Sequence, residues 1–372
     1  MSIKYVVCKG YYGLGGNIAV LTCAMRVAEK LNRRLVVDWV ENIGYGVKGQ
    51  DIFQLLFENR ELYLEKGMFS TARVWPDYWT NFIDRTMPHS KEVVLHRVSS
   101  EHLEQADLAS VEDCDVIVIS RDDKYWHRHE YYAEMSGLIN RLVPSERLRK
   151  KIDSFQSEKL GDNAIGVHFR HGNGERTVVP PDIEWFFAAV DGFLVQSPSS
   201  NILVCTDCSA VEKAFVERYG SKVVFTEKEH PPLGSGPLFN INYSDAEKLA
   251  NAEEALLDMW LLSKCSYIVG SKSFFSGVAI KLNGNFNRNN EKTWIPKYRE
   301  FKPGEGIVHV SAVPSINKMF VEEGLPTDGV YCEVGDSDVA LYYLYEFIYG
   351  GNDFDQLDWS LVKSKIKRHR LY

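Results

Sequence analysis

The fold class is decided by the stretch Tyr5-Val-Val-Cys-Lys-Gly-Tyr-Tyr-Gly-Leu-Gly-Gly16, in which a β-rich run leads directly into a glycine-rich loop. Apolar side chains then recur at helical spacing from Ile18 to Leu31, and Leu35-Val-Val-Asp38 is the next β-rich run. A strand, a loop, a helix and a second strand form a βαβ unit, whose two strands run parallel. The first half of the chain is therefore predicted to hold a parallel α/β sheet.

The same alternation returns after residue 163. Further β-rich runs, separated by segments with helical spacing, cover residues 164–169, 201–205, 223–225 and 267–270. Two such sheets predict an α/β protein of the GT-B architecture, with two Rossmann-like doubly wound domains facing a central cleft. The predicted parts are a first domain with irregular insertions, a second domain and a helical extension packing back on the first: residues 1–145, 146–300 and 301–372. Dehydrogenases and kinases share this pattern, so the fold alone does not decide the chemistry.

The composition describes a globular protein of 372 residues, with 45% apolar and 25% charged residues. A net charge of −8 argues against a protein that binds nucleic acid backbones, because such proteins carry a basic surplus. No run approaches the roughly 18 apolar residues of a membrane helix, and the N-terminus lacks the regions of a signal peptide. Seven cysteines, an odd number without tight clustering, suggest free thiols. We therefore expect a cytoplasmic protein.

One cysteine pair, Cys205-Thr-Asp-Cys208, has CxxC spacing. A zinc site would need two more ligands, but no second CxxC pair exists and the nearest downstream histidine is His230. We predict a buried strand cysteine and a loop cysteine rather than a metal or redox site.

The glycines of the first loop are candidates for anion binding. Gly13 and Gly15 stand between a strand and a helix, where the backbone can approach an anion and the helix N-terminus carries partial positive charge. Their spacing is not that of the dinucleotide motif, although Asp38 ends the next strand where a ribose-binding acid would lie. A tight strand-to-helix turn explains the same glycines equally well.

The strongest chemical signal is the stretch Gly166-Val-His-Phe-Arg-His-Gly-Asn-Gly-Glu175. Strand alternation turns His168 and Arg170 to one side at the carboxyl end of a strand, and His171 and a glycine loop follow. A guanidinium there suits a diphosphate, because it forms two parallel charge-assisted hydrogen bonds and keeps its charge at any working pH. We favour this role for Arg170 over a salt bridge at a strand end.

Four further residues could contact a nucleotide or a sugar. Asp207 follows the strand 201–205, where it could bind a sugar hydroxyl or cap a helix. Asp258 lies among apolar residues of a helix, where an unpaired carboxylate is costly, and the N1 and N2 edge of guanine would give it a partner. Ser271 and Ser273 form a hydroxyl-rich turn suited to phosphate or ribose.

The stretch Tyr125-Trp-His-Arg-His-Glu-Tyr-Tyr132 is rich in aromatic and basic groups. It could form an aromatic shelf for a sugar, but packing at a domain interface is the better interpretation.

Together these blocks resemble the α1,6-fucosyltransferase family, and within it the rhizobial nodulation fucosyltransferases. The resemblance covers residues 1 to about 280 in outline and is specific in four short blocks: 166–175, 205–207, 236–238 and 255–265. It also covers the opening segments 13–16 and 35–39. It implies a GT-B fold, GDP-β-L-fucose as the donor and no metal or other cofactor. The predicted partners are accordingly a GDP-sugar and a glycan acceptor.

The resemblance also assigns roles to residues. Arg170 matches the essential diphosphate-binding arginine, and His168 would sit beside the phosphates. His171 stands where mammalian relatives carry a second arginine. Asp258 matches the guanine-reading aspartate, whereas Asp207 matches the first of two family aspartates and Cys208 replaces the second.

The implied reaction is an inverting displacement by an acceptor hydroxyl, expected to be O6 of a GlcNAc unit. A carboxylate would accept the hydroxyl proton, and Glu175 is the candidate. Two alternatives stay open: a GT-B transferase that uses another nucleotide-sugar, and a catalytically silent protein that binds GDP or a glycan.

Overall fold

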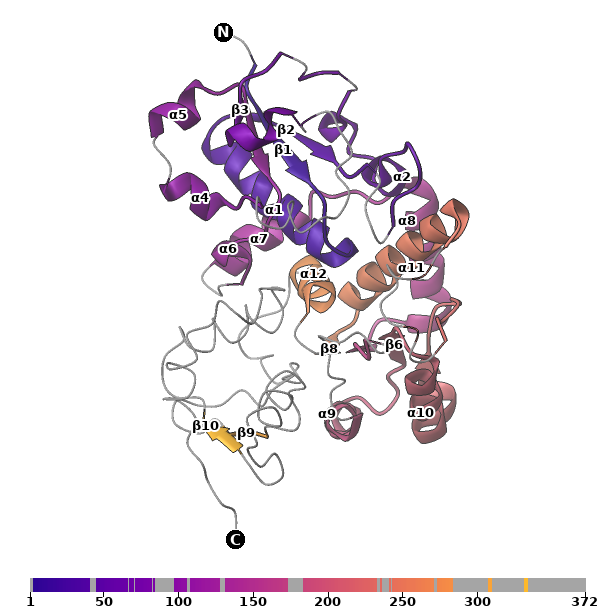
Figure 1. The fold of residues 1–372 in the computed structure, drawn as a ribbon. Helices are drawn as coiled ribbons and strands as arrows, with labels where there is room; N and C mark the ends of the chain where they lie inside the picture. The colour runs from indigo at the N-terminus through magenta and orange to yellow at the C-terminus, as the bar shows by residue number, and fades with distance from the viewer. Residues whose placement is uncertain are drawn as a thin grey trace.

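The computed structural model contains two four-stranded parallel sheets, and Figure 1 shows them with their helices. It describes residues 3–40, 45–65, 67–69, 71–81, 83, 97–105, 108–127, 131–172, 183–232, 235, 241, 243–270 and 273–283. The backbone alone is described at 81, 105, 108–110, 185, 307–309 and 331–333.

The first sheet has the strand order β2-β1-β4-β3, with every neighbouring pair parallel. Its strands are β1 (Tyr5–Lys9), β2 (Arg34–Asp38), β3 (Val74–Trp75) and β4 (Val116–Ile119). Helix α1 (Leu14–Lys30) connects β1 to β2 and is buried from Leu14 to Ala28, because apolar residues cover nearly its whole circumference. The βαβ unit predicted from the sequence is confirmed.

The second sheet has the order β7-β6-β5-β8, again parallel throughout. Its strands are β5 (Ile165–Phe169), β6 (Ile202–Thr206), β7 (Val223–Val224) and β8 (Tyr267–Gly270), with helices α9 (Ile183–Gln196), α10 (Ser209–Tyr219), α11 (Asp245–Ser263) and α12 (Phe274–Asn283). Helix α11 begins at Asp245. The reason is a capping box, in which Ser244 accepts from the Glu247 N–H and Glu247 accepts from the Ser244 N–H.

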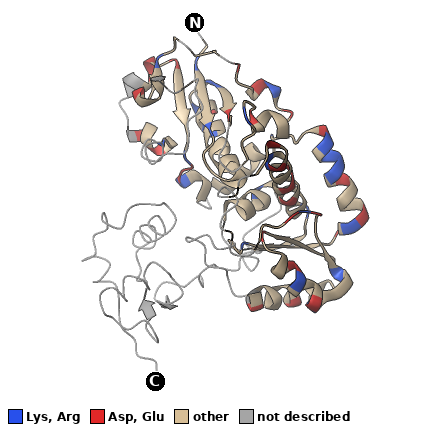
Figure 2. Ribbon diagram, turned by 45° about the vertical axis from the view of Figure 1, so that its right-hand side comes forward, with Lys and Arg blue, Asp and Glu red and all other residues tan. Residues whose placement is uncertain are grey.

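Short elements fill the rest of the described chain. They are α2 (Ile52–Leu56), η1 (Arg60–Leu62), η2 (Asp77–Asn81), α4 (Ser100–Gln105), α5 (Leu108–Asp113), α6 (Lys124–His127), α7 (Tyr132–Ile139), α8 (Glu146–Phe155), η4 (Gln156–Leu160), η5 (Gly220–Lys222) and the antiparallel pair β9 (Ile307–His309) and β10 (Tyr331–Glu333). Helix α8 buries only Leu148 and Ile152, and Figure 2 shows several lysine and arginine positions along its ribbon.

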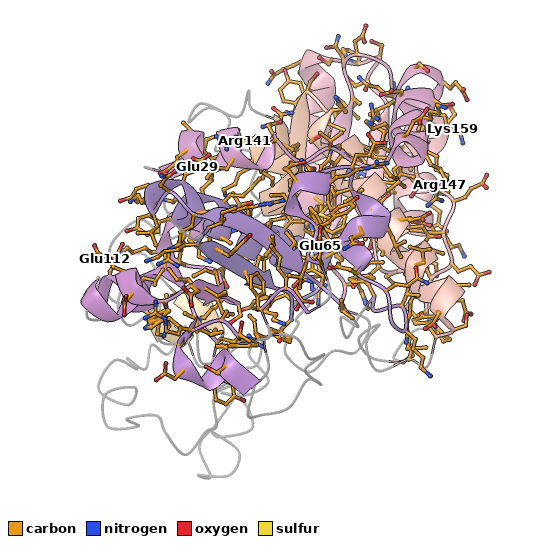
Figure 3. All side chains as sticks on the ribbon, turned by 90° about the horizontal axis from the view of Figure 1, so that it is seen from above. Glu29, Glu65, Glu112, Arg141, Arg147 and Lys159 are labelled. Carbon is orange, nitrogen blue, oxygen red and sulfur yellow. The ribbon has the colours of Figure 1, made fainter. Side chains whose placement is uncertain are left out.

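Helix α12 ties the two sheets together, because it packs on α1 and α7 as well as on α11. The Tyr132 hydroxyl donates to the carbonyl of Ile280, and the Ser136 hydroxyl donates to that of Lys281, both at 2.6 Å. Helix α1 is joined further to the turn after α7 by an ion pair between Glu29 and Arg141, which lie side by side in Figure 3. One cluster of buried apolar side chains therefore runs from Val6 of β1 through α12 to Leu203 of β6.

Candidate functional site

The loop that carries Arg170 is held in place by Asp207. Arg170 directly follows β5, and Asp207 directly follows the neighbouring strand β6. Asp207 Oδ1 accepts from the His171 N–H at 2.7 Å, and Oδ2 accepts from the Gly172 N–H at 2.9 Å. The alternative that Asp207 caps a helix is wrong, because Cys208 occupies that position of α10 and the carboxylate binds the loop instead.

His168 and Ser273, both predicted to bind the donor, lie close together. His168 is buried, and its ring stacks on Phe275 with centroids 4.6 Å apart and an interplanar angle of 11°. Its Nδ1 is 3.5 Å from the Ser273 hydroxyl, which also accepts from the Ser276 N–H at the start of α12. The positive end of the α12 dipole therefore lies beside the end of β5.

A tyrosine from the first half of the chain reaches the same place. Tyr45 lies close enough to Arg170 and Asp207 for both to act on its ionisation, and it hydrogen-bonds the backbone of Leu14. Burial raises the pKa of Tyr45, while the charge of Arg170 opposes that rise. The sequence did not reveal Tyr45, because it stands in an irregular segment without any periodic pattern.

The two glycines of the first loop have different surroundings. Gly13 caps α1 with a φ of −59°, and a Cβ there would meet no atom within 4 Å. A Cβ on Gly15, within α1, would lie 2.8 Å from the backbone nitrogen of Phe275. Residues 10–13 form the short turn from β1 into α1, but the backbone conformation does not require glycine at either position, because Gly13 has an ordinary φ and Gly15 is helical. Gly15 permits close contact of α1 and α12, and anion binding at Gly13 and Gly15 stays a prediction.

Asp258 is 5% exposed but has partners within the chain. Its Oδ1 accepts from the Thr226 hydroxyl and its Oδ2 from Lys228 Nζ, both at 2.6 Å. Burial acts to lower the pKa of Lys228, but the Asp258 carboxylate outweighs it and the pKa is raised. The premise that Asp258 lacks a partner is therefore wrong, since the loop after β7 supplies two. Its role as a guanine reader rests on the resemblance and stays a prediction.

The cysteines of the CxxC pair are buried free thiols. Burial raises the pKa of Cys205 well above its ordinary value, which disfavours the thiolate that a metal would need. Among the residues that the structure describes, no group of three His, Cys, Asp or Glu side chains is placed to hold a metal ion. Metal-independent activity remains a prediction.

The stretch 125–132 packs between elements where it is described. Trp126 is buried beneath the Lys281 ammonium, which lies 4.0 Å from the ring centroid, and Tyr125 stacks under the Arg26 guanidinium at 3.4 Å. Interface packing is thus the role of these rings, whereas the side chain of His127 is 39% exposed.

Two predicted site residues, Glu175 and Ser271, lie outside the described residues, as do the blocks 173–175 and 236–238. Across the described ranges, no helix has the length and apolar character that a membrane span requires.

Comparison with known proteins places these features in a family. The family model for Nodulation protein Z (NodZ) matches residues 2–279. Nodulation protein Z of Azorhizobium caulinodans is 28% identical over 292 residues, which are 72% of this chain and 84% of that protein. The protein of the same name from Sinorhizobium fredii is 23% identical over 290 residues, covering 72% of this chain and 86% of its own length.

Solved structures share the fold. The crystal structure of NodZ α-1,6-fucosyltransferase soaked with GDP-fucose has a TM-score of 0.53 at 19% identity and covers 76% of this chain and 93% of its own. Fucosyltransferase NodZ from Bradyrhizobium has a TM-score of 0.51 at 18% identity, covering 75% and 93%. Dehydrogenases and kinases share the α/β pattern, but the family match identifies this chain as a glycosyltransferase. With a parallel α/β fold, an arginine loop at the end of β5 and a family model that fits most of its length, this chain belongs to the nodulation protein Z family.

Proposed function

We propose that this protein is an inverting fucosyltransferase that moves L-fucose from GDP-β-L-fucose to O6 of a GlcNAc unit in an oligosaccharide or glycoconjugate. The carrying observation is the Arg170 loop, which Asp207 holds through two backbone hydrogen bonds at the carboxyl end of β5. Solved members of the family have been soaked with GDP-fucose and co-crystallised with GDP, which supports the choice of donor.

The proposal includes the GT-B arrangement and the division at residues 145/146 and 300/301. The first domain would take the acceptor and the second the donor, in a cytoplasmic enzyme. Both sheets are parallel, and ligands of such sheets bind beyond the carboxyl ends of the strands.

In the second domain the donor diphosphate would lie against Arg170, His168 and the N-terminus of α12 at Ser273, with His171 beside it. As the sugar leaves, negative charge grows on the β-phosphate, and a fixed guanidinium stabilises that charge. The α12 dipole adds to this positive potential, so the site needs no metal ion. Asp258 would read guanine, and Glu175 is the predicted proton acceptor.

The test is donor binding and transfer with and without EDTA. We expect calorimetric binding of GDP and metal-independent fucosylation of GlcNAc-containing acceptors, followed by mass spectrometry of the products. Arg170→Ala is expected to lower the transfer rate by about 10²–10³-fold, the usual cost of losing one such donor. Arg218→Ala is the matched control, because Arg218 is exposed and its partners among the described residues belong to α9 and α10. Full turnover of Arg170→Ala would overturn the role of Arg170.

A donor panel of GDP-, UDP- and dTDP-sugars separates this proposal from a transferase with a different donor. A protein that binds GDP yet shows neither transfer nor donor hydrolysis would be a silent nucleotide-binding protein.

A further inference from the structure

Ligands of a parallel sheet bind beyond the carboxyl ends of adjacent strands. In the second sheet, Arg170 and Ser273 follow the strands β5 and β8, at the point where the strand order reverses. In the first sheet, β1 and β4 are adjacent and parallel, so the segments that follow them begin at one point of the sheet edge. The proposed donor site leaves this first point, beyond the ends of β1 and β4, without a role.

Three side chains meet at this first point. Tyr12 follows β1, Asp122 follows β4, and His127 ends the short helix α6. Asp122 Oδ2 is 2.7 Å from His127 Nε2, and the Tyr12 hydroxyl also hydrogen-bonds Asp122. The Arg97 guanidinium lies 4.6 Å from the Tyr12 ring centroid and fixes the tyrosine in turn.

The charge of Asp122 determines which nitrogen of the His127 imidazole carries the proton. Burial acts to raise the pKa of Asp122, but hydrogen bonds and charges from His127, Arg121 and Tyr12 lower it, so the carboxylate stays ionised. An ionised carboxylate can only accept, and His127 Nε2 must therefore carry the proton. In the neutral imidazole the lone pair is then on Nδ1, the arrangement that an orienting carboxylate gives to a general base.

Asp122 and His127, together called the dyad, differ in solvent exposure in the way that an orienting carboxylate and a general base require. The side chain of Asp122 is 14% exposed, whereas that of His127 is 39% exposed. A carboxylate fixed in the interior therefore holds an imidazole that solvent and a substrate can reach.

The dyad also lies next to the donor side. The His127 ring centroid is 5.7 Å from that of Phe274, the first residue of α12, and Tyr12 contacts the same ring at 5.8 Å. The adjacent Phe275 stacks on His168, the residue two before Arg170. Two ring contacts and one peptide bond thus connect the imidazole to the proposed diphosphate site.

We propose that His127, oriented by Asp122, is the general base that takes the proton of the acceptor hydroxyl. This inference rests on the proposed transferase function and replaces Glu175 in that role. The hydroxyl oxygen forms a bond to C1 of the donor sugar, and the bond from C1 to the diphosphate oxygen breaks, leaving its electron pair on GDP. The hydroxyl proton passes to Nδ1 of His127, and the imidazolium then returns it to solvent.

The test compares His127→Gln with Lys124→Gln, a matched control on the same helix. Lys124 pairs with Glu104, so its substitution also removes an ion pair of α6 but leaves the imidazole in place. General bases typically contribute about 10²–10⁴-fold, and His127→Gln is expected to lower kcat by at least about 10²-fold. GDP affinity and thermal stability should match those of Lys124→Gln.

The pH profile distinguishes a base from a structural ion pair. In wild type kcat should rise with pH as the imidazole loses its proton, since only the neutral ring accepts one. Among the described residues, Asp122 faces the imidazole directly, and Arg97 and Arg121 act on Asp122 or on the Tyr12 hydroxyl that bonds it. This rise of kcat with pH, the acidic limb of the profile, should disappear in His127→Gln and shift along the pH axis in Asp122→Asn. In His127→Gly the limb should return when imidazole is added.

Several results would overturn the inference. They are a kcat for His127→Gln within a few-fold of wild type, retention of the limb in that variant, and failure of imidazole to rescue His127→Gly while GDP still binds. Loss of the limb in Glu175→Gln alone would return the role to Glu175. The proposed function fails separately, if wild type transfers no sugar from any donor.

Discussion

Asp207 connects two neighbouring strands through the backbone of the loop between β5 and α9. Its carboxylate accepts from two N–H groups and thereby fixes the chain on either side of His171. The geometry of Arg170 thus depends on a residue that need not touch the donor.

Asp207→Ala should release this loop. Two backbone N–H groups lose their acceptor, and an unsatisfied buried group costs about 1–3 kcal/mol. We expect a lower melting temperature together with about tenfold weaker GDP binding in calorimetry, where each 1.4 kcal/mol changes affinity by a factor of ten. Asp191→Ala, which removes an exposed carboxylate of α9, serves as the control. Unchanged GDP affinity would show that the loop holds its shape without Asp207.

The stability of the fold also depends on the buried ion pair between Lys228 and Asp258. Lys228→Met leaves a buried carboxylate without its cation, and breaking a buried pair from one side costs about 3–5 kcal/mol. Urea denaturation should show this loss, and Lys228→Met/Asp258→Asn should recover much of it. Equal stability of the single and the double variant would contradict the pairing.

At the scale of elements, the N-terminus of α2 has a carboxylate in an unusual state. Asp51 accepts from the N–H groups of Phe53 and Trp39. Burial, with the negative charge of Asp38, nevertheless raises the pKa of Asp51 to about 7. The protonated Asp51 carboxyl group stabilises the folded state fully at pH values below the pKa of Asp51 in the unfolded chain. This stabilisation is lost as the pH rises through the folded-state pKa of about 7.

Asp51→Asn should remove that loss and still cap the helix, because asparagine caps as well as aspartate. Urea midpoints at pH 5 and pH 8 should therefore differ less in the variant than in wild type. An unchanged pH dependence would assign the effect to other groups.

Sequence patterns predicted the strands and helices more successfully than they predicted the tertiary contacts between side chains. Regular periodicity located the strands and put Arg170 and His168 at a strand end, and the structure gave them neighbours. Tyr45, Thr226 and Lys228 could not be found in this way, because irregular segments carry them and only tertiary folding brings them to Arg170 or Asp258. The pair of Asp122 and His127 had no signal beyond an aromatic stretch, since its meaning depends on the order of the strands.

At the scale of the whole molecule, the contact between the starts of α1 and α12 joins the two sheets. Gly15 and Gly13 provide a matched pair of tests, because only Gly15 has a close neighbour. Gly15→Ala places a Cβ 2.8 Å from the Phe275 nitrogen, and such overpacking typically costs about 1–3 kcal/mol.

We expect Gly15→Ala to lower both the melting temperature and the affinity for GDP, because Phe275 also stacks on His168. Gly13→Ala should lower the melting temperature less, because it meets no neighbour and only replaces glycine by a poorer N-cap residue. Equal melting temperatures for the two variants would show that α1 and α12 separate at little cost.

The apolar cluster shared by β1, α1, α12 and β6 also limits how such enzymes can be recombined. A chimera joined near residue 145 would bring together an α1 and an α12 that were selected in different proteins. Their mismatch would fall directly beneath the residues proposed for both substrates. Acceptor preference therefore cannot be transferred by exchanging the first half of the chain alone. A functional chimera must also include the α12 residues that pack against the new α1.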